Sequence, residues 1–349
     1  WTDKDGISDT WKEVARYAFD LYEELLGIIF KESKSNNSDI LFSDNHLGHA
    51  YATTSYYISS GDIIRSRINI ASDWGNPSPS GGDYNFQTII HEIGHALGLG
   101  HQGKYNGSYD FNTHAVFAND SWQMSMMSYI SQGNNPNVKS GDAYVASPMT
   151  ADLVAFDNKY GIYGYGPAKH SFLGDTTYGF NSTIKSTTNL IWSNLSFLLD
   201  NTAFTISDSS GTDTLDFSEF DNAQIIDLRA PNITSKTLYL SSVGDSGKTK
   251  NLSIAAGSVI ENAAGGRGND LITGNDSDNF LVGNLGNDTL SGGGGKDTIS
   301  GGDGADLAIV SGKNSEWEST LIDAKTSTYL LSQSKTNNTL LLTEIEKIQ

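Results

Sequence analysis

The sequence predicts two domains, an α+β domain over residues 1–165 and an all-β domain over residues 166–349. Apolar residues at helical spacing and a histidine-rich stretch characterise the first part. After residue 165, helical periodicity gives way to Gly, Asp, Asn and Ser with short apolar runs. There, residues 265–309 divide into five consecutive nine-residue units, which predict a C-terminal domain of parallel β-roll or β-sandwich-like type. A chain of 349 residues is long enough for both domains.

The first predicted element is a helix capped by Ser8 or Asp9, with one apolar stripe that we interpret as its packing face. The stripe consists of Trp11, Val14, Ala15, Ala18, Tyr22 and Leu25. Runs rich in β-branched and aromatic residues then predict four strands, at residues 27–30, 39–42, 49–57 and 65–70. After a Gly, Ser and Pro-rich loop at 71–83, a second helix begins near Tyr84, and a last helix of this domain covers 150–160 and ends at Gly161.

Residues 91–101 read HEIGHALGLGH, and their spacing predicts a zinc site. His91 and His95 are four residues apart, so both imidazoles project from one face of a helix. Glu92 is placed to take a proton from a metal-bound water. Because a catalytic zinc usually has three protein ligands, His101 is the candidate for the third. Gly98 can adopt the positive φ that ends a helix and turns the chain back toward it.

A chance match to HExxH, with two histidines at the edge of a core, is the alternative interpretation. The extended pattern HExxHxxGxxH fixes five positions and favours the metal site. Downstream, residues 125–129 read SMMSY. The metzincin pattern pairs the long zinc motif with a Met-turn, whose methionine lies under the metal ligands, and we predict Met127 in that place. Ordinary core filling is the alternative for Met126 and Met127.

Together, HEIGHALGLGH and the MSY that follows resemble the serralysin family of bacterial secreted zinc proteases, within the metzincins. The resemblance implies a metzincin-type catalytic domain with one zinc. It also implies that Tyr129 can ligate zinc in the resting enzyme and stabilise the oxyanion during turnover. In the family, the strand before the zinc helix is the sheet edge along which substrate backbone pairs. Gln102 departs from the proline that usually follows the third histidine, which bears on the shape of the loop.

The five nine-residue units read GGRGNDLIT, GNDSDNFLV, GNLGNDTLS, GGGGKDTIS and GGDGADLAI. They match the RTX nonapeptide GGxGxDxUx, in which the turn offers oxygen ligands to calcium and the apolar position points into a β-roll. A flexible Gly-rich linker would not keep this period. The predicted inward residues are Ile272, Leu281, Leu290, Ile299 and Ala308.

Family geometry places two units in each turn of the roll, so the predicted calcium ligands sort into two stacks. One stack consists of Asp270, Asp288 and Asp306, and the other of Asn279 and Asp297. The neutral amide of Asn279 is expected to weaken the second stack, because calcium affinity follows the number of charged ligands.

The resemblance also implies a calcium site at the domain junction. Its ligands would be the carbonyls of Phe172 and Gly174, the hydroxyl of Thr176, and the carboxylates of Asp208 and Asp213. Ser210 stands where the family usually has glycine, and its carbonyl can still serve. Beyond the repeats, residues 319–323, 328–331 and 339–343 are predicted to form antiparallel strands.

Composition limits the classes of partner. Forty-one acidic against 22 basic residues give a formal charge of −19, which argues against nucleic acid and favours divalent cations. No cysteine is present, so there is no disulfide framework. No apolar run approaches the length of a membrane span, which argues against stable membrane association. The remaining histidines each stand alone and are assigned surface or core roles: His46, His49, His114 and His170.

These observations predict a secreted, extracellular zinc endopeptidase of broad specificity, with one catalytic Zn²⁺ and several structural Ca²⁺. The expected partners are polypeptide substrates, a type I secretion exporter and a proteinaceous inhibitor from the producing cell, and the expected state is a monomer. One alternative is a calcium-dependent RTX adhesin or binding module with a non-proteolytic zinc centre. Another is an inactive family member, which would lack Glu92 or Tyr129, although both are present.

Overall fold

The computed structural model describes residues 6–78, 80–107, 109–232, 234–311, 316–323, 327–333, 336 and 338–349. The chain divides into two compact units. Unit 1 consists of Trp1–Ser171, Thr187–Ile191 and Asn201–Thr205, and unit 2 of Phe172–Ser186, Trp192–Asp200 and Ile206–Gln349. Unit 1 therefore extends a few residues past position 165 and takes in two short later segments.

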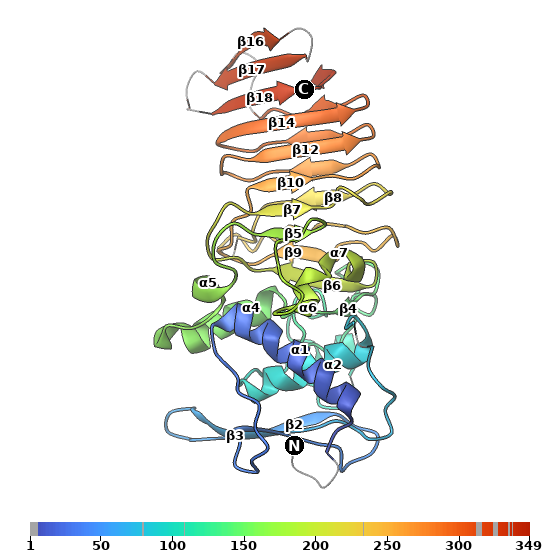
Figure 1. The fold of residues 1–349 in the computed structure, drawn as a ribbon, viewed down its shortest axis with the longest axis vertical. Helices are drawn as coiled ribbons and strands as arrows, with labels where there is room; N and C mark the ends of the chain where they lie inside the picture. The colour runs from blue at the N-terminus through green and yellow to red at the C-terminus, as the bar shows by residue number, and fades with distance from the viewer. Residues whose placement is uncertain are drawn as a thin grey trace. The chain divides into compact units, whose positions relative to one another are not determined.

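Helix α1 (Asp9–Leu26) opens unit 1 and begins and ends at identifiable caps (Figure 1). The Ser8 hydroxyl accepts a hydrogen bond from the Trp11 N–H at 3.3 Å. Gly27 follows the helix with a left-handed φ of 70°, and its N–H reaches the Glu23 carbonyl at 2.9 Å. All six residues of the predicted apolar stripe are buried, which confirms the helix and its packing face.

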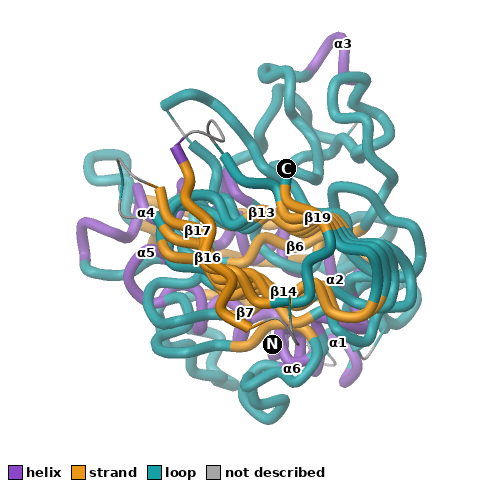
Figure 2. Tube along the Cα trace, turned by 90° about the horizontal axis from the view of Figure 1, so that it is seen from above, coloured by secondary structure: helices purple, strands orange, loops and turns teal. Residues whose placement is uncertain are grey.

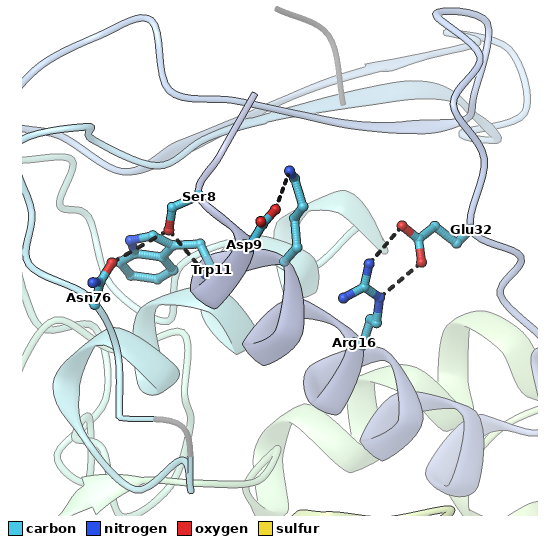
Figure 3. A network of polar contacts seen from close by, with 7 residues as sticks. Ser8, Asp9, Trp11, Arg16, Glu32 and Asn76 are labelled. Carbon is cyan, nitrogen blue, oxygen red and sulfur yellow. Dashed lines mark hydrogen bonds and ion pairs between the residues drawn. The ribbon is translucent and has the colours of Figure 1, made fainter. Parts of the chain in front are cut away.

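The predicted strand at 27–30 is wrong, because α1 is followed there by a capped turn and a loop. The left-handed Gly27 redirects the chain, and the Glu23 carboxylate accepts from the Phe30 N–H. Ile29, whose apolar side chain suggested a strand, is 88% exposed. Figure 3 shows that Arg16 of the helix donates two hydrogen bonds, of 2.9 and 3.0 Å, to Glu32 of this loop.

A three-stranded sheet follows, made of β1 (Ile40–Ser43), β2 (Tyr51–Tyr56) and β3 (Ile63–Asn69). These strands confirm the predictions at 39–42, 49–57 and 65–70. The spatial order is β1-β3-β2, with β1 parallel and β2 antiparallel to β3. The strand that directly precedes the zinc-motif helix is therefore central, and the expectation that it forms the sheet edge is wrong. Ser66 and Ile68, on one face of this strand, are fully buried.

Helix α2 (Tyr84–Ala96) carries the histidine motif and begins where the sequence predicts. The Asp83 side chain caps it by accepting from the Phe86 N–H at 2.7 Å. Helix α4 (Thr150–Tyr160) is also confirmed, but the chain continues past Gly161 in a 3₁₀ turn, and the left-handed residue is Gly164 with a φ of 91°. The shorter elements of this unit are α3 (Phe111–His114), β4 (Tyr144–Val145) and α5 (Pro167–His170).

Unit 2 is built mainly from two parallel sheets whose strands alternate along the chain, stacked as successive rungs in Figure 1. The first contains β5 (Thr177–Gly179), β7 (Thr214–Asp216), β10 (Asn262–Ala264), β12 (Phe280–Leu285), β14 (Lys296–Asp303) and β18 (Thr339–Thr343). The second contains β8 (Ile225–Asp227), β11 (Leu271–Thr273), β13 (Thr289–Ser291), β15 (Leu307–Ala308) and β19 (Lys347–Ile348). Beyond β18, the first sheet continues with two antiparallel strands, β17 (Thr328–Gln333) and β16 (Trp317–Asp323). The other elements after residue 189 are α6 (Leu190–Ser193), α7 (Leu195–Leu198), β6 (Thr202–Ile206) and β9 (Leu252–Ile254).

From β10 to β14 in the first sheet and from β11 to β15 in the second, neighbouring strands are 18 residues apart, so two nonapeptides make one turn. Leu281 pairs with Ile299 in one sheet, and Ile272 pairs with Leu290 in the other. Seen from above in Figure 2, rungs of the same sheet lie behind one another. All five predicted inward residues have 0% exposure, which confirms the parallel arrangement and its core.

The roll continues on both sides of the five recognised units. Before them, Leu215 pairs with Ala263, and Ile226 pairs with Ile272. After them, β18 and β19 pair in parallel with β14 and β15. The predicted antiparallel strands near the C-terminus are confirmed as β16, β17 and β18, but β18 belongs to the roll as well. In the described part of the chain, no helix is long and apolar enough to cross a membrane.

Candidate metal centre and calcium-binding turns

Helix α2 and the turn after it bring three imidazoles together. His91 and His95 lie on one face of the helix, and Gly98, with a φ of 94°, reverses the chain so that His101 meets them. One ring nitrogen from each lies within 4.8 Å of the others. Nε2 of His95 is 3.0 Å from Nε2 of His101. Among the described residues, this is the single group of three or more His, Cys, Asp or Glu side chains whose ligand atoms lie close enough together to hold one metal ion.

The other ring nitrogen of each histidine is held by a backbone carbonyl, at 2.8 Å in all three cases. Nδ1 of His91 faces the Met126 carbonyl, Nδ1 of His95 faces that of Leu99, and Nδ1 of His101 faces that of Tyr105. A carbonyl can only accept, so each Nδ1 carries the proton and each Nε2 presents a lone pair. Three lone pairs therefore converge on one point.

This donor set fits zinc. Burial lowers the pKa of His91 to about 3 and that of His95 to about 4, and it also lowers the pKa of His101, so the rings stay neutral as metal ligands must. Two unprotonated nitrogens 3.0 Å apart repel one another unless a cation lies between them. Tetrahedral ligands at about 2.0–2.1 Å from zinc would be roughly 3.4 Å apart, close to this separation.

Glu92 directly follows His91 on α2 and is only 5% exposed. Its Oε2 atom is buried without a hydrogen-bond partner among the described residues. Burial raises its pKa to about 8, against a smaller lowering by the backbone of Ala52 in the edge strand β2. A buried polar atom without a partner is costly in a folded protein and marks a position where a ligand or water is expected.

The Met-turn is fixed by a buried carboxylate that the sequence analysis missed. Asp152, on α4, accepts hydrogen bonds from the Ser125 hydroxyl at 2.6 Å and from the Met126 and Met149 N–H groups at 2.7 and 2.9 Å. Met126 in turn offers its carbonyl to His91. Asp152 therefore orients the Met-turn, and the Met126 carbonyl of this turn orients His91. Asp152 is 26 residues from Met126 in the sequence, so no local pattern linked it to the turn.

Both methionines of the turn are buried against α2. A side chain at Gly94, which directly precedes His95, would collide with Cε of Met126 and Sδ of Met127. The ends of both methionine side chains therefore pack directly against the histidine-bearing helix at Gly94, and a larger residue there would have to displace them. The Met126 sulfur also accepts from the Tyr22 hydroxyl at 3.3 Å.

Tyr129 lies at the histidine cluster. Its ring centroid is 4.5 Å from that of His101 and 5.7 Å from that of His91, and the ring stacks on Tyr105 at 4.9 Å. Burial, followed by the nearby Glu92 charge, raises the pKa of Tyr129 to about 12, so its hydroxyl remains a donor at neutral pH.

A second buried carboxylate, Asp120, also went unrecognised in the sequence. Its Oδ1 accepts from the Ser128 hydroxyl at 2.6 Å and from the Tyr105 hydroxyl at 3.0 Å. Tyr105 supplies the carbonyl that orients His101, and Ser128 precedes Tyr129. This network therefore joins the third histidine to the tyrosine.

The side-chain oxygen of Gln102 is buried without a partner in the described chain.

The turns of the roll contain similar buried oxygens. In Asp288, Asp297 and Asp306, Oδ2 is buried and has no partner among the described residues. Asp270 differs, because its two oxygens accept from the Gln224 and Gly266 N–H groups. Three buried carboxylate oxygens without partners, in glycine-rich turns that also offer carbonyls, suit calcium.

Asn279 differs from the aspartates because its amide is satisfied within the protein. Its Nδ2 donates to the Glu261 carbonyl at 2.9 Å, and its Oδ1 accepts from the Asn275 N–H at 2.8 Å. Glu261 lies 18 residues before Asn279, in the same ladder, and its carboxylate accepts from the Asp213 N–H. Sequence reasoning missed Glu261 because its unit lacks the glycines of the repeat.

The five residues of the expected junction site lie together within unit 2. The Thr176 N–H donates to Asp213 at 2.7 Å, and the Thr176 hydroxyl donates to the Gly174 carbonyl at 3.1 Å. The Phe172 carbonyl accepts from the Ser209 N–H, next to Asp208. Burial raises the pKa of both Asp208 and Asp213. A calcium ion would offset this cost by supplying positive charge.

Comparison with known proteins links the chain to a family of metalloproteases. Residues 169–338 match the family "Peptidase M10 serralysin C terminal". The chain is 38% identical over 291 residues to serralysin of Proteus mirabilis, which covers 78% of this chain and 55% of that protein. It is 39% identical over 279 residues to the metalloprotease AprA of Pseudomonas entomophila (strain L48), covering 77% and 54%. It is 34% identical over 269 residues to serralysin A of Dickeya chrysanthemi, covering 74% and 52%. The chain thus spans about half the length of the curated relatives that it matches.

Proposed function

This chain belongs to the serralysin family, and on that premise we propose that it is a secreted zinc-dependent endopeptidase with a metzincin-type catalytic domain and a calcium-binding RTX domain. The observation that carries the proposal is the convergence of three Nε2 lone pairs, together with the buried Oε2 of Glu92, which follows His91 on α2 and has no hydrogen-bond partner among the described residues. In this proposal, unit 1 is catalytic and unit 2 binds calcium.

The roles of the residues follow from their chemistry. Held by His91, His95 and His101, zinc would supply Lewis acidity and lower the pKa of a bound water. Glu92 takes the proton of the attacking water and passes it to the leaving amine. Tyr129 donates a hydrogen bond to the developing oxyanion. Met127 forms the apolar floor under the ligands.

Edge strand β2 is the proposed docking site for substrate backbone. It pairs with β3 on one side, and Ala52 within it lies next to Glu92. An extended peptide added to this edge would gain main-chain hydrogen bonds from the strand and pass the carboxylate. Because backbone pairing is independent of side chains, it supports broad specificity for polypeptide substrates.

The roll is the proposed site of several structural calcium ions. We assign Asp270, Asp288 and Asp306 to one stack and Asn279 and Asp297 to the other. Phe172, Gly174, Thr176, Asp208 and Asp213 form the junction site. Calcium is scarce inside cells and abundant outside, so the domain would complete its folding after export.

Without calcium, unit 2 should become less stable as the pH rises. Burial, with its neighbours Asp270 and Asp306, raises the pKa of Asp288 to about 7, and burial raises those of Asp270 and Asp297 to about 6. The folded state therefore holds protons that the unfolded state has released above pH 4, and stability falls between about pH 4 and 7. Urea unfolding of the chain in the presence of a calcium chelator, at pH 5 and at pH 8, measures this difference in the stability of unit 2. Saturating calcium should abolish the decrease, whereas an apo unit that is more stable at pH 8 contradicts the assignment.

Asn279→Asp should strengthen calcium binding in the second stack. The change replaces a neutral amide with a charged oxygen beside Asp297, and calcium affinity follows the number of charged ligands. Calorimetric calcium titration should show tighter binding in the variant than in the wild type. Unchanged or weaker binding would remove Asn279 from the ligand set.

Secretion and partners complete the proposal. The type I exporter is the proposed route out of the cell, a proteinaceous inhibitor would protect the producing cell, and the enzyme would act as a monomer. A calcium-dependent RTX adhesin would need only the roll, so the His–Glu–Tyr cluster favours the protease.

Mass spectrometry of casein digests tests the proposal. The zinc- and calcium-loaded chain should release internal fragments with new ends, and a zinc-selective chelator should stop this release. Intact casein after incubation with protein carrying both metals would overturn it and favour the binding module.

A further inference from the structure

A ladder of hydrogen bonds connects successive turns on one side of the roll. The Asp270 N–H donates to Oδ1 of Asp288 at 2.7 Å, and the Asp288 N–H donates to Oδ1 of Asp306 at 2.7 Å. Each rung is 18 residues long. In every rung, one carboxylate oxygen accepts from the preceding turn, which leaves the second oxygen to face the interior of its own turn.

Glu346 forms the next rung, although it follows Asp306 by 40 residues and lies outside the repeats. Its Oε2 accepts from the Asp306 N–H at 2.6 Å, as an aspartate oxygen does in earlier rungs. The strand after it is in register, since Ala308 pairs with Ile348. Strands β16 and β17 lie in the intervening sequence, so the regular period is interrupted while the ladder continues in space.

The backbone of the last turn repeats the earlier oxygen arrangement. In one turn, Oδ2 of Asp288 lies over Gly283, which also faces the Gly301 carbonyl. In the next, Oδ2 of Asp306 lies over Gly301, which faces the Glu344 carbonyl. Glu344 therefore occupies the position of a repeat glycine, but its φ of 54° lies in the left-handed region, whereas Gly283 and Gly301 lie outside that region. The Ser300 hydroxyl donates a hydrogen bond to the Glu344 carboxylate at 3.0 Å.

Asp306 supplies an independent observation that points to a ligand. The residue is 1% exposed, and its Oδ2 has no hydrogen-bond partner in the part of the chain that the structure describes. This atom points into the space bounded by Gly301 and the Glu344 carbonyl. A buried carboxylate oxygen left without a partner calls for a cation, and an all-oxygen surrounding selects a hard one such as calcium.

We propose that the segment Glu344–Glu346 closes the roll with a terminal calcium site, formed by the carboxylates of Asp306 and Glu346 and the carbonyl of Glu344. The inference rests on the proposed calcium-binding role of this unit and adds ligands from outside the nonapeptide array. In this proposal, the C-terminal strands cap the last turn of the roll. Because the cap supplies calcium ligands, its packing on the roll depends on bound calcium.

Counting bound calcium by equilibrium dialysis of the full chain tests the site. Glu346→Gln keeps the hydrogen-bond acceptor but removes the charge, so the variant should fold and bind one ion fewer, or bind that ion at least about tenfold more weakly. Glu346→Asp should retain the ion. Glu318→Gln, an exposed change in β16, is the matched control for loss of one charge and should bind as the wild type does.

The outcomes separate this site from the wider calcium proposal. If Asp288→Asn loses an ion while Glu346→Gln matches Glu318→Gln, the terminal site is overturned and the repeat sites stand. If the wild type binds no calcium, both proposals fail. Should Glu346→Gln prove unstable, amide hydrogen exchange of the wild-type chain decides. Calcium should slow exchange of the residues 344–349 at least about tenfold if they bind an ion, and exchange there that calcium leaves unchanged overturns the site.

Discussion

Glu92→Gln should reduce kcat for peptide hydrolysis by about 100- to 10,000-fold, the range of general acid–base catalysis. Glutamine fills the same space beside His91 but cannot accept the proton of the attacking water. The three imidazoles and their carbonyl partners are untouched, so zinc should remain bound at one ion per chain. Stopped assays with a quenched peptide, together with metal analysis of the same sample, measure both quantities.

Tyr129→Phe is the comparison variant for this result. It removes a donor to the oxyanion and leaves the base, so its kcat should fall less than that of Glu92→Gln. Near-wild-type activity in Glu92→Gln with zinc bound would show that the proton moves through another group, and the assignment of Glu92 as base would be abandoned.

Asp152→Ala should destabilise unit 1 by about 2–6 kcal/mol, because the Met126 and Met149 N–H groups would each lose a buried acceptor at about 1–3 kcal/mol. The Met-turn carbonyl that holds His91 depends on the same carboxylate. Zinc affinity should therefore fall about 10- to 100-fold, as for other groups that orient metal ligands. Chemical unfolding at saturating calcium and competition with a zinc chelator measure the two effects.

Asp157→Ala, on the same helix, is the matched control. Asp157 accepts one exposed hydrogen bond from the Ala168 N–H, so its removal should cost less than about 1 kcal/mol and leave zinc affinity unchanged. If Asp152→Ala binds zinc as tightly as Asp157→Ala does, the carboxylate supports the fold without orienting the metal site.

The histidine cluster and the roll could be predicted because their information is local. HEIGHALGLGH places its three imidazoles through one helix and one glycine turn, and Gly98 does adopt the positive φ. The nonapeptides repeat a short pattern, so the buried residues from Ile272 to Ala308 follow from the period alone. Neither inference needs contacts between distant segments.

The residues that support the histidines could not be found in the same way. Asp120 and Asp152 are single acidic residues whose partners lie in other segments, and their burial becomes visible only when the chain is folded. The order β1-β3-β2 also depends on tertiary pairing, and the error about the sheet edge arose there. At Gly27 the helix cap overrode the strand preference of the apolar residues that follow it.

The ends of the roll show the limit of pattern recognition. Glu261 and Glu346 occupy ladder positions in turns that lack the glycines of the repeat, and β16 and β17 break the period before β18. The strands at these ends stay in register with the roll, although the nonapeptide pattern is no longer present in their sequence.

Zinc titration of the metal-free chain at saturating calcium, with peptidase activity recorded at each step, tests the central claim most directly. Activity should rise linearly and level off at one zinc per chain, because one set of three imidazoles holds one catalytic ion. A folded protein that binds one equivalent of zinc at His91, His95 and His101 and cleaves no peptide would contradict the account.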